Sequence, residues 1–163
     1  MFGLNKKDSV NQSIKYIARF LVKNIEKSKN IVGITGSYNN KKMKFSICKK
    51  ICEEILEYKK SVCILDTDYM LNNTEKFETK SLSSVVFDEV IREEISNSSH
   101  SHDIVIMNAP CILSNVVSLD YLSLCNKIFL LERCMYTKYN DFENILGKLK
   151  DNNLVVSGII SYI

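Results

Sequence analysis

The sequence predicts an α/β protein with three layers, in which helices cover both faces of a mainly parallel sheet of about five strands. Short apolar segments alternate with amphipathic helical segments along the chain. Polar residues follow directly after the apolar segments, at the sheet edge where such proteins bind ligands. A length of 163 residues suits a single domain, with a leading helix in 1–28 and an α/β core in 30–163.

Five segments have the three- and four-residue apolar spacing of helices that pack on one face. They are residues 9–25, 45–57, 81–95, about 115–124 and 138–149. Ser9 or Asn11 is expected to cap the first of these helices. Asn140 and Glu143 are expected to form a capping box at the start of the last one.

Five short apolar runs are the predicted strands, and they are residues 31–34, 62–65, 104–107, 128–131 and 154–160. The polar segment 69–80 leaves room for one further short strand. The serine-rich segment around His100 and His102 is expected to be a solvated loop. Two histidines without nearby cysteines are a weak indication of a metal site.

Composition places the chain among ordinary globular proteins, with 45% hydrophobic and 25% charged residues. No run approaches the ~20 apolar residues of a membrane-spanning helix, so no transmembrane segment is expected. The amino-terminal residues do not read as a secretory signal, and the six cysteines are therefore expected to be small buried core residues without disulfides. A cytoplasmic protein is the expectation.

Charge is distributed unevenly along the chain. Residues 1–60 contain 14 Lys and Arg but 5 Asp and Glu, whereas residues 61–163 contain 8 and 14. The basic half suits a nucleotide, an acidic tail of a partner or an anionic surface. A solvated, lysine-rich surface without a ligand explains the same pattern equally well.

The stretch Asn30–Lys44 is the strongest candidate for a binding site, because a strand, a polar loop with lysines and a helix follow one another. Loop amides and a helix N-terminus built in this order bind phosphate groups. The candidate nucleotide-binding residues are Gly36, Ser37, Asn39, Asn40, Lys41, Lys42, Lys44 and Ser46. Glycine is scarce in this loop, and asparagine replaces its left-handed conformations only in part.

Acidic and amide side chains follow the next strands. Asp66 and Asp68 stand two residues apart on an extended segment and therefore point the same way. Such a pair holds hydrated Mg²⁺ or accepts a proton from a nucleophile, and it also occurs as a turn or helix-capping pair. Asn108 ends the third predicted strand, and Glu132 with Arg133 ends the fourth.

These motifs, in this order, resemble the deviant P-loop ATPases of the MinD/ParA type. The resemblance is strongest to the bacterial tyrosine kinases of capsule and exopolysaccharide biosynthesis. It is carried by 34–46, by CILDTD at 63–68, by HDIVIMNAPCIL at 102–113 and by NKIFLLER at 126–133. The resemblance implies a three-layer P-loop NTPase-like fold, Mg-ATP as cofactor and nucleotide contacts from the loop and Arg133. It also implies catalytic roles for Asp66 and Asp68 and metal contacts from Asp66 and Asn108.

The loop departs from that family's pattern, T-S-x-x-P-G-E-G-K-S. In an ungapped alignment Asn40 and Lys42 replace glycines and Met43 replaces the phosphate-binding lysine. Counting back from Asp66 instead places Lys44 at the lysine position. Asn108 stands where the family has a carboxylate, which weakens a magnesium site.

Three functions follow from these matches and departures. The first is a pseudo-ATPase or pseudokinase with a regulatory or partner-binding role in exopolysaccharide or capsule biosynthesis, without cofactor. The second is an active ATPase or tyrosine kinase that uses Mg-ATP through an unusual loop. The third is an α/β interaction module with no nucleotide history. Loss of several loop groups favours the first, which would not be an enzyme.

A protein is the expected partner: the cytoplasmic tail of a membrane co-polymerase, a paralogue or a second copy of the chain. No nucleic-acid partner is expected. The resemblance implies a bacterial protein, recruited to the inner face of the membrane through its partner.

Overall fold

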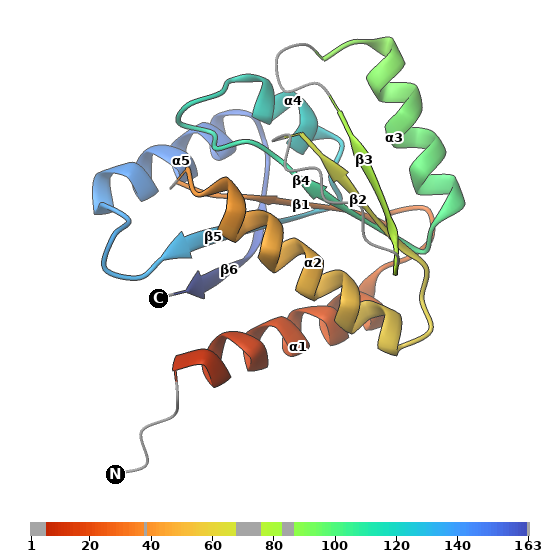
Figure 1. Ribbon diagram of the computed structural model, residues 1–163. Helices are drawn as coiled ribbons and strands as arrows, with labels where there is room; N and C mark the ends of the chain where they lie inside the picture. The colour runs from red at the N-terminus through yellow and green to blue at the C-terminus, as the bar shows by residue number, and fades with distance from the viewer. Residues whose placement is uncertain (1–5, 38, 68–75, 83–86, 163) are drawn as a thin grey trace.

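The computed structural model describes residues 6–37, 39–67, 76–82 and 87–162, and these residues form one six-stranded sheet (Figure 1). Its strands are β1 (Ile31–Thr35), β2 (Val62–Asp66), β3 (Glu78–Ser81), β4 (Ile104–Asn108), β5 (Lys127–Arg133) and β6 (Val156–Tyr162). They lie in the order β3-β2-β4-β1-β5-β6, and every neighbouring pair is parallel. The predicted α/β class is confirmed, with six strands because β3 adds an edge strand.

Within the described ranges, five helices cover the two faces of the sheet. They are α1 (Lys6–Asn24), α2 (Lys41–Glu57), α3 (Glu89–Ser101), α4 (Val117–Ser123) and α5 (Tyr139–Asp151). Figure 1 shows α1 and α2 below the sheet and α3, α4 and α5 above it. The apolar side chains of α1 and α2 form one core with the lower face, and those of the other three helices form two cores with the upper face.

The apolar stripe of α2 fixes how the helix lies on the sheet. Ile47, Cys48, Ile51, Cys52 and Ile55 are each at most 2% exposed, as their helical spacing predicts. All six cysteines are free thiols, but the prediction that all are buried is wrong for Cys134, which is exposed. Burial raises the pKa of Cys52 well above its usual value. This stripe sets the amino-terminal end of α2 against the sheet edge where the candidate site lies.

The prediction of a solvated loop around residues 96–102 is wrong, because α3 continues to Ser101. The buried side chain of Asn30 donates to the carbonyls of Ser99 and His102, at 2.8 Å each. Ser99 Oγ in turn donates to Asn30 Oδ1 at 2.6 Å. Partners from another part of the chain thus satisfy the last turn, which local propensity alone does not reveal.

The predicted start of that helix at residue 81 is also wrong. Ser81 ends β3, and the helix begins at Glu89 behind Asp88, whose side chain accepts from the Ile91 N–H at 3.0 Å. Residues 83–86, which fall in the predicted helix, lie outside the described residues.

The two predictions of helix caps are wrong as well. The first helix begins at Lys6, so Ser9 and Asn11 lie inside it. In α5 the N-cap position belongs to Lys138, which makes no side-chain cap bond, and Glu143 accepts from the Tyr139 hydroxyl. The helix ends therefore lie some residues away from the sites that the sequence predicts.

Candidate phosphate-loop site

Four polar side chains lie buried at the carboxyl ends of the parallel strands. Thr35, Asp66 and Asn108 are 0% exposed, and Glu132 is 6% exposed. The chain leaves β1 toward β2 through α2, and it leaves β4 toward β5 through α4 (Figure 1). The carboxyl ends of β1 and β4 are therefore the switch point, where open α/β sheets bind ligands.

The loop between β1 and α2 packs closely against β5. A Cβ atom on Gly36 would lie 2.2 Å from the carbonyl oxygen of Leu131, so only glycine fits there. Thr35 Oγ1 donates to the Pro110 carbonyl at 2.7 Å, and Cys111 Sγ contacts the Ser37 carbonyl at 3.4 Å. These contacts hold the loop against the segment that follows β4.

Asn40 caps the helix that follows the loop. Its side-chain oxygen accepts from the Met43 N–H at 3.1 Å, which is one of the open donors of the helix N-terminus. Asn39 is exposed, and it precedes this cap directly. The two asparagines are expected from the sequence to take the place of glycine in the loop. Instead, the Asn40 side chain caps α2, and its oxygen accepts from an N–H group that could otherwise bind phosphate.

Glu132 accepts three hydrogen bonds around the loop. Its Oε1 accepts from the Ser37 N–H at 3.1 Å, and its Oε2 accepts from the Ser37 and Thr137 hydroxyls, the latter at 2.7 Å. Sequence reasoning places Glu132 at a strand end but does not anticipate these donors. A glutamate near the end of a buried strand needs hydrogen-bond donors around its carboxyl group. This requirement is the feature of the sequence that could have predicted the contacts.

The three lysines at the start of α2 differ in exposure. Lys44 is 5% exposed and its ammonium donates to the Ala109 carbonyl, directly after β4. Lys41 and Lys42 are exposed, and so are Met43, at 38%, and Ser46. The structure therefore brings Lys44 to the switch point and leaves Met43 outside it.

Asp66 and Asn108 lie directly opposite each other in the register of β2 and β4. Asn108 Nδ2 donates to Asp66 Oδ1 at 2.7 Å, and Thr67 Oγ1 donates to the Asn108 carbonyl at the same distance. The Cys48 thiol lies 3.9 Å from Asn108 Oδ1. Asp68, expected to act beside Asp66, lies outside the described residues.

Arg133 extends from the end of β5 over a hollow of about 350 Å³. Its guanidinium stacks 3.6 Å above the ring centre of Tyr136, and Thr137, Phe142 and Ser161 also line the hollow. Glu132 lines the same hollow, so it lies between the loop after β1 and the Arg133 side of the strand end.

The described residues contain no group of three or more His, Cys, Asp or Glu side chains arranged to hold a metal ion. In the same part of the chain, none of the helices has the length and apolar character needed to cross a bilayer.

Comparison with known proteins rests on structure. No protein-family model matches the sequence, and no curated protein matches it. Among solved structures, the kinase domain of the Escherichia coli tyrosine kinase ETK superposes with a TM-score of 0.77 at 13% identity, over 93% of this chain and 74% of that one. The VpsO kinase domain gives 0.69 at 10% identity, over 96% and 97%.

P-loop NTPases of other kinds are also similar. The cell-division protein MinD of Aquifex aeolicus gives a TM-score of 0.62 at 15% identity, over 81% of this chain and 68% of that one. A structure of FlhF complexed with GMPPNP and Mg²⁺ gives 0.55 at 14% identity, over 98% and 67%. The resemblance in the motifs is thus confirmed at the level of the fold: the chain has the P-loop NTPase fold that MinD and the bacterial tyrosine kinase domains share.

Proposed function

We propose that this chain is a degenerate relative of the P-loop ATPases and tyrosine kinases, and that it acts by binding a protein partner. The observation that carries the proposal is the contact between Glu132 and Ser37. A phosphate-binding loop works because several N–H donors point at the anion together. Here the Ser37 N–H donates to Glu132, and the Met43 N–H donates to Asn40.

Charge supports the same proposal. Glu132 is a buried carboxyl group within hydrogen-bonding distance of the loop backbone. An ionised carboxylate there repels a phosphate strongly, because water screens little between buried groups. An incoming nucleotide would have to displace Glu132 from three donors as well as shed its own water.

The magnesium ligands give a third argument. Asp66 Oδ1 accepts a hydrogen bond from the Asn108 side-chain N–H at 2.7 Å, so an oxygen that a cation would need is already hydrogen-bonded. Ser46, the hydroxyl residue two positions after Lys44, lies on the exposed side of α2. Within the part of the chain that the structure describes, one paired carboxylate and one amide do not fit the oxygen-rich shell that Mg²⁺ prefers.

A second function keeps one specific observation in its favour, namely the position of Lys44. Its ammonium is buried at the switch point, where a phosphate-binding lysine belongs in this fold. An active ATPase or tyrosine kinase would use Lys44, Asp66 and Mg-ATP, after rearrangement of Glu132 and Asn108.

Thermal unfolding with and without Mg-ATP separates the two functions. We expect no shift of the melting temperature at millimolar Mg-ATP, whereas a ligand at 100 times its Kd adds about 2.7 kcal/mol of stability. The MinD protein of Aquifex aeolicus serves as a positive control under the same conditions. A shift in the wild-type chain that disappears in both Lys44→Met and Asp66→Asn would establish nucleotide binding at this site and contradict the degenerate form.

The partner follows from the proposed pathway. We infer a cytoplasmic role in exopolysaccharide or capsule biosynthesis, with the tail of a membrane co-polymerase, a paralogue or a second copy as partner. Recruitment by such a tail would bring the chain to the inner face of the membrane. Binding to a co-polymerase tail should have the same affinity with and without Mg-ATP, and a nucleotide-dependent affinity would contradict a degenerate site.

A further inference from the structure

The two edges of the sheet differ in how they are protected. At one edge, β3 is a short strand whose charged side chains are paired: Lys80 contacts Glu94 at 2.6 Å, and His102 contacts Glu78 at 3.2 Å. Such charges keep an edge strand from pairing with other chains. This edge is therefore closed to strand addition.

The other edge lacks that protection. Strand β6 has seven residues, VSGIISY, without a charged side chain, and within the described part of the chain it pairs with β5 alone. Ile159 is 52% exposed, and Val155, just before the strand, is 79% exposed. A long, uncharged edge strand is a template for an added strand.

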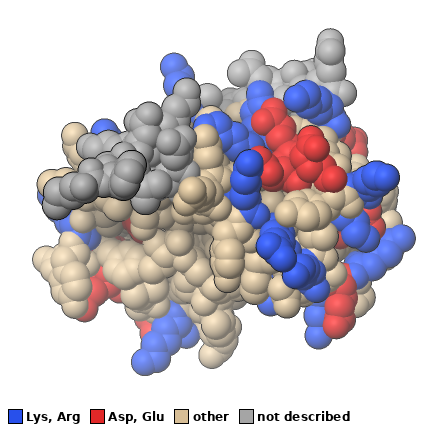
Figure 2. Space-filling model, turned by 90° about the horizontal axis from the view of Figure 1, so that it is seen from below, with Lys and Arg blue, Asp and Glu red and all other residues tan. Residues whose placement is uncertain are grey.

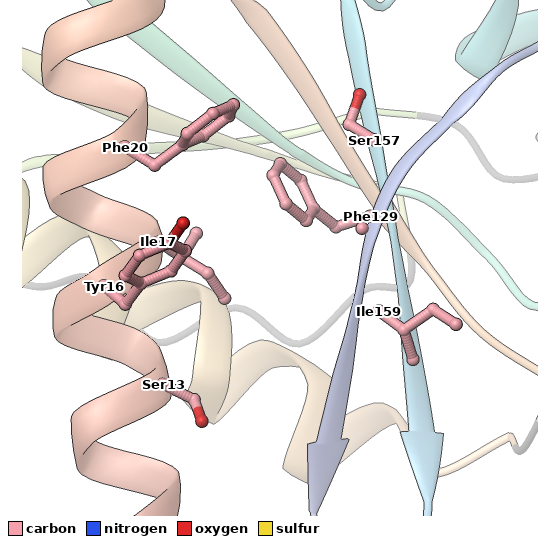
Figure 3. A pocket seen from close by; sticks show the side chains of 8 residues that line it. Ser13, Tyr16, Ile17, Phe20, Phe129, Ser157 and Ile159 are labelled. Atoms are coloured by element: carbon pink, nitrogen blue, oxygen red, sulfur yellow. The ribbon is translucent and has the colours of Figure 1, made fainter.

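A groove of about 240 Å³ runs along this edge between β6 and α1 (Figure 3). Tyr16, Ile17 and Phe20 line it from the helix, and Phe129 lines its floor. Figure 3 shows Phe20 and Phe129 facing each other, and their rings meet edge to face with centres 6.4 Å apart. The groove can accept a large apolar side chain beside the strand edge.

Gly158 keeps the floor of the groove open. A Cβ atom there would lie 3.0 Å from the Phe129 ring, so a side chain at this position would press on the ring. Glycine inside a strand is typical of a place where another backbone approaches closely. The absence of a side chain at Gly158 therefore leaves room both for a strand added to β6 and for a side chain in the groove.

Positively charged side chains flank the groove, whose own lining residues are uncharged. A second hollow shares Tyr16 and Phe20 with the groove and is also lined by Arg19 and Lys23. Lys127 lies 5.7 Å from the centre of the Phe20 ring. Residues 10–24 and 156–162 contain no aspartate or glutamate. Figure 2, which shows the molecule from the side where α1 lies, displays a broad uncharged area, with blue side chains on its right and red ones among them. The occupant therefore needs negative charge together with an apolar anchor.

A second copy of the chain fits this surface poorly. Two β6 edges paired antiparallel around a two-fold axis would place both α1 helices on the same face of the joined sheet. Residues 10–24 of α1 carry Lys15, Arg19 and Lys23 but no acidic residue, so two such helices side by side on one face would repel each other.

We propose that the β6 edge and the α1 groove bind an extended acidic segment of a partner protein. The segment adds a parallel or antiparallel strand to β6, places one large apolar side chain on Phe129 and directs its carboxylates toward Arg19 and Lys23. This surface is separate from the phosphate-loop site, so the inference stands whether or not the chain binds a nucleotide.

Selection from a random peptide display library on the wild-type chain provides the probe. We expect the enriched peptides to carry an excess of Asp and Glu, and these acidic residues should alternate with apolar ones. The most enriched peptide, synthesised with a fluorescent label, should bind with an affinity that falls as salt is added. Methylation of its alternate backbone amides on the β6 side should abolish binding, because strand addition depends on main-chain hydrogen bonds.

Two variants locate the site on the protein. Arg19→Glu and Tyr16→Ser should each weaken the peptide by about tenfold, since charge complementarity and aromatic anchors dominate such contacts. Lys150→Glu and Tyr139→Ser are the matched controls on α5, and Tyr139 is 71% exposed against 72% for Tyr16. The controls should bind like wild type, and circular dichroism should confirm that all four variants fold.

Several results would overturn the proposal. They are failure to enrich any peptide, enrichment without acidic excess, and binding that survives methylation or both groove variants. A wild-type dimer in sedimentation that Tyr16→Ser dissociates would assign the surface to a second copy instead.

Discussion

The Glu132 carboxylate lies 3.1 Å from the Ser37 backbone nitrogen, so a buried acid at the end of β5 holds the loop that follows β1. Thr137, four residues beyond the end of that strand, donates to the same carboxylate. These hydrogen bonds link the carboxyl end of β5 to the loop after β1, one residue beyond Gly36. They make Glu132 a structural residue of the loop, and its removal should be felt as lost stability.

Glu132→Gln should lower the free energy of unfolding by about 1–3 kcal/mol, because an amide N–H would then face the donors of Ser37 and Thr137. Urea unfolding followed by circular dichroism measures the change. Glu93→Gln on the exposed face of α3 is the control and should stay within about 0.5 kcal/mol of wild type. Equal stability of both variants would contradict a structural role for Glu132.

Gly36→Ala should destabilise the chain by more than about 3 kcal/mol, because the added Cβ would overlap backbone that cannot easily move. The clash is with the Leu131 carbonyl, at 2.2 Å. Gly147→Ala is the matched control: it lies inside α5 with open space around it, and alanine there should stabilise the chain by about 0.5–1 kcal/mol. Thermal unfolding of the two alanine variants should therefore give shifts of opposite sign.

Asp103 should make part of the stability depend on pH. The Ser61 backbone N–H, 2.9 Å from its carboxylate, lowers the pKa of Asp103 below 3.8, with help from the Ser61 hydroxyl and Lys60. A lowered carboxyl pKa stabilises the fold at pH values above 3.8, and that stability is lost as the pH falls through the folded-state pKa.

Asp103→Asn should thus cost about 1 kcal/mol at neutral pH, a value reduced by solvent exposure of the pair. The difference from wild type should shrink below pH 3.8 and vanish in stronger acid. Urea unfolding across this pH range measures it, with Asp151→Asn on the exposed end of α5 as control. A difference that stays constant down to low pH would rule out the charged hydrogen bond.

The sequence predicts the layers and the binding edge of this fold because both follow from repeated local patterns. Apolar runs and helical stripes mark the elements, and parallel strands necessarily bring Asp66, Asn108 and Glu132 to one edge. The same patterns cannot tell which strands are neighbours in space. The pairing of Asp66 with Asn108 depends on β2 lying beside β4, a contact between residues 42 positions apart.

Residues missed by the sequence reasoning are those whose partners come from distant segments. Asn30 completes the last turn of α3 from 69 positions away in the chain, so a serine-rich stretch of weak helix propensity remains helical. Glu132 meets Ser37 across 95 positions. Propensity and spacing describe a segment alone, and neither contains information about such contacts.

Lys44 offers the sharpest test of the phosphate-loop geometry, because its neighbours in sequence point elsewhere. Its ammonium donates to the Ala109 carbonyl while Lys42 is exposed. Lys44→Met keeps the length of the side chain but removes the donor, which leaves a buried carbonyl poorer by one hydrogen bond. We expect a loss of about 1–3 kcal/mol in the free energy of unfolding. Lys42→Met should change it by less than about 0.5 kcal/mol. Comparable losses in both variants, measured by urea unfolding, would show that the loop lysines are equivalent and that Lys44 does not occupy the switch point.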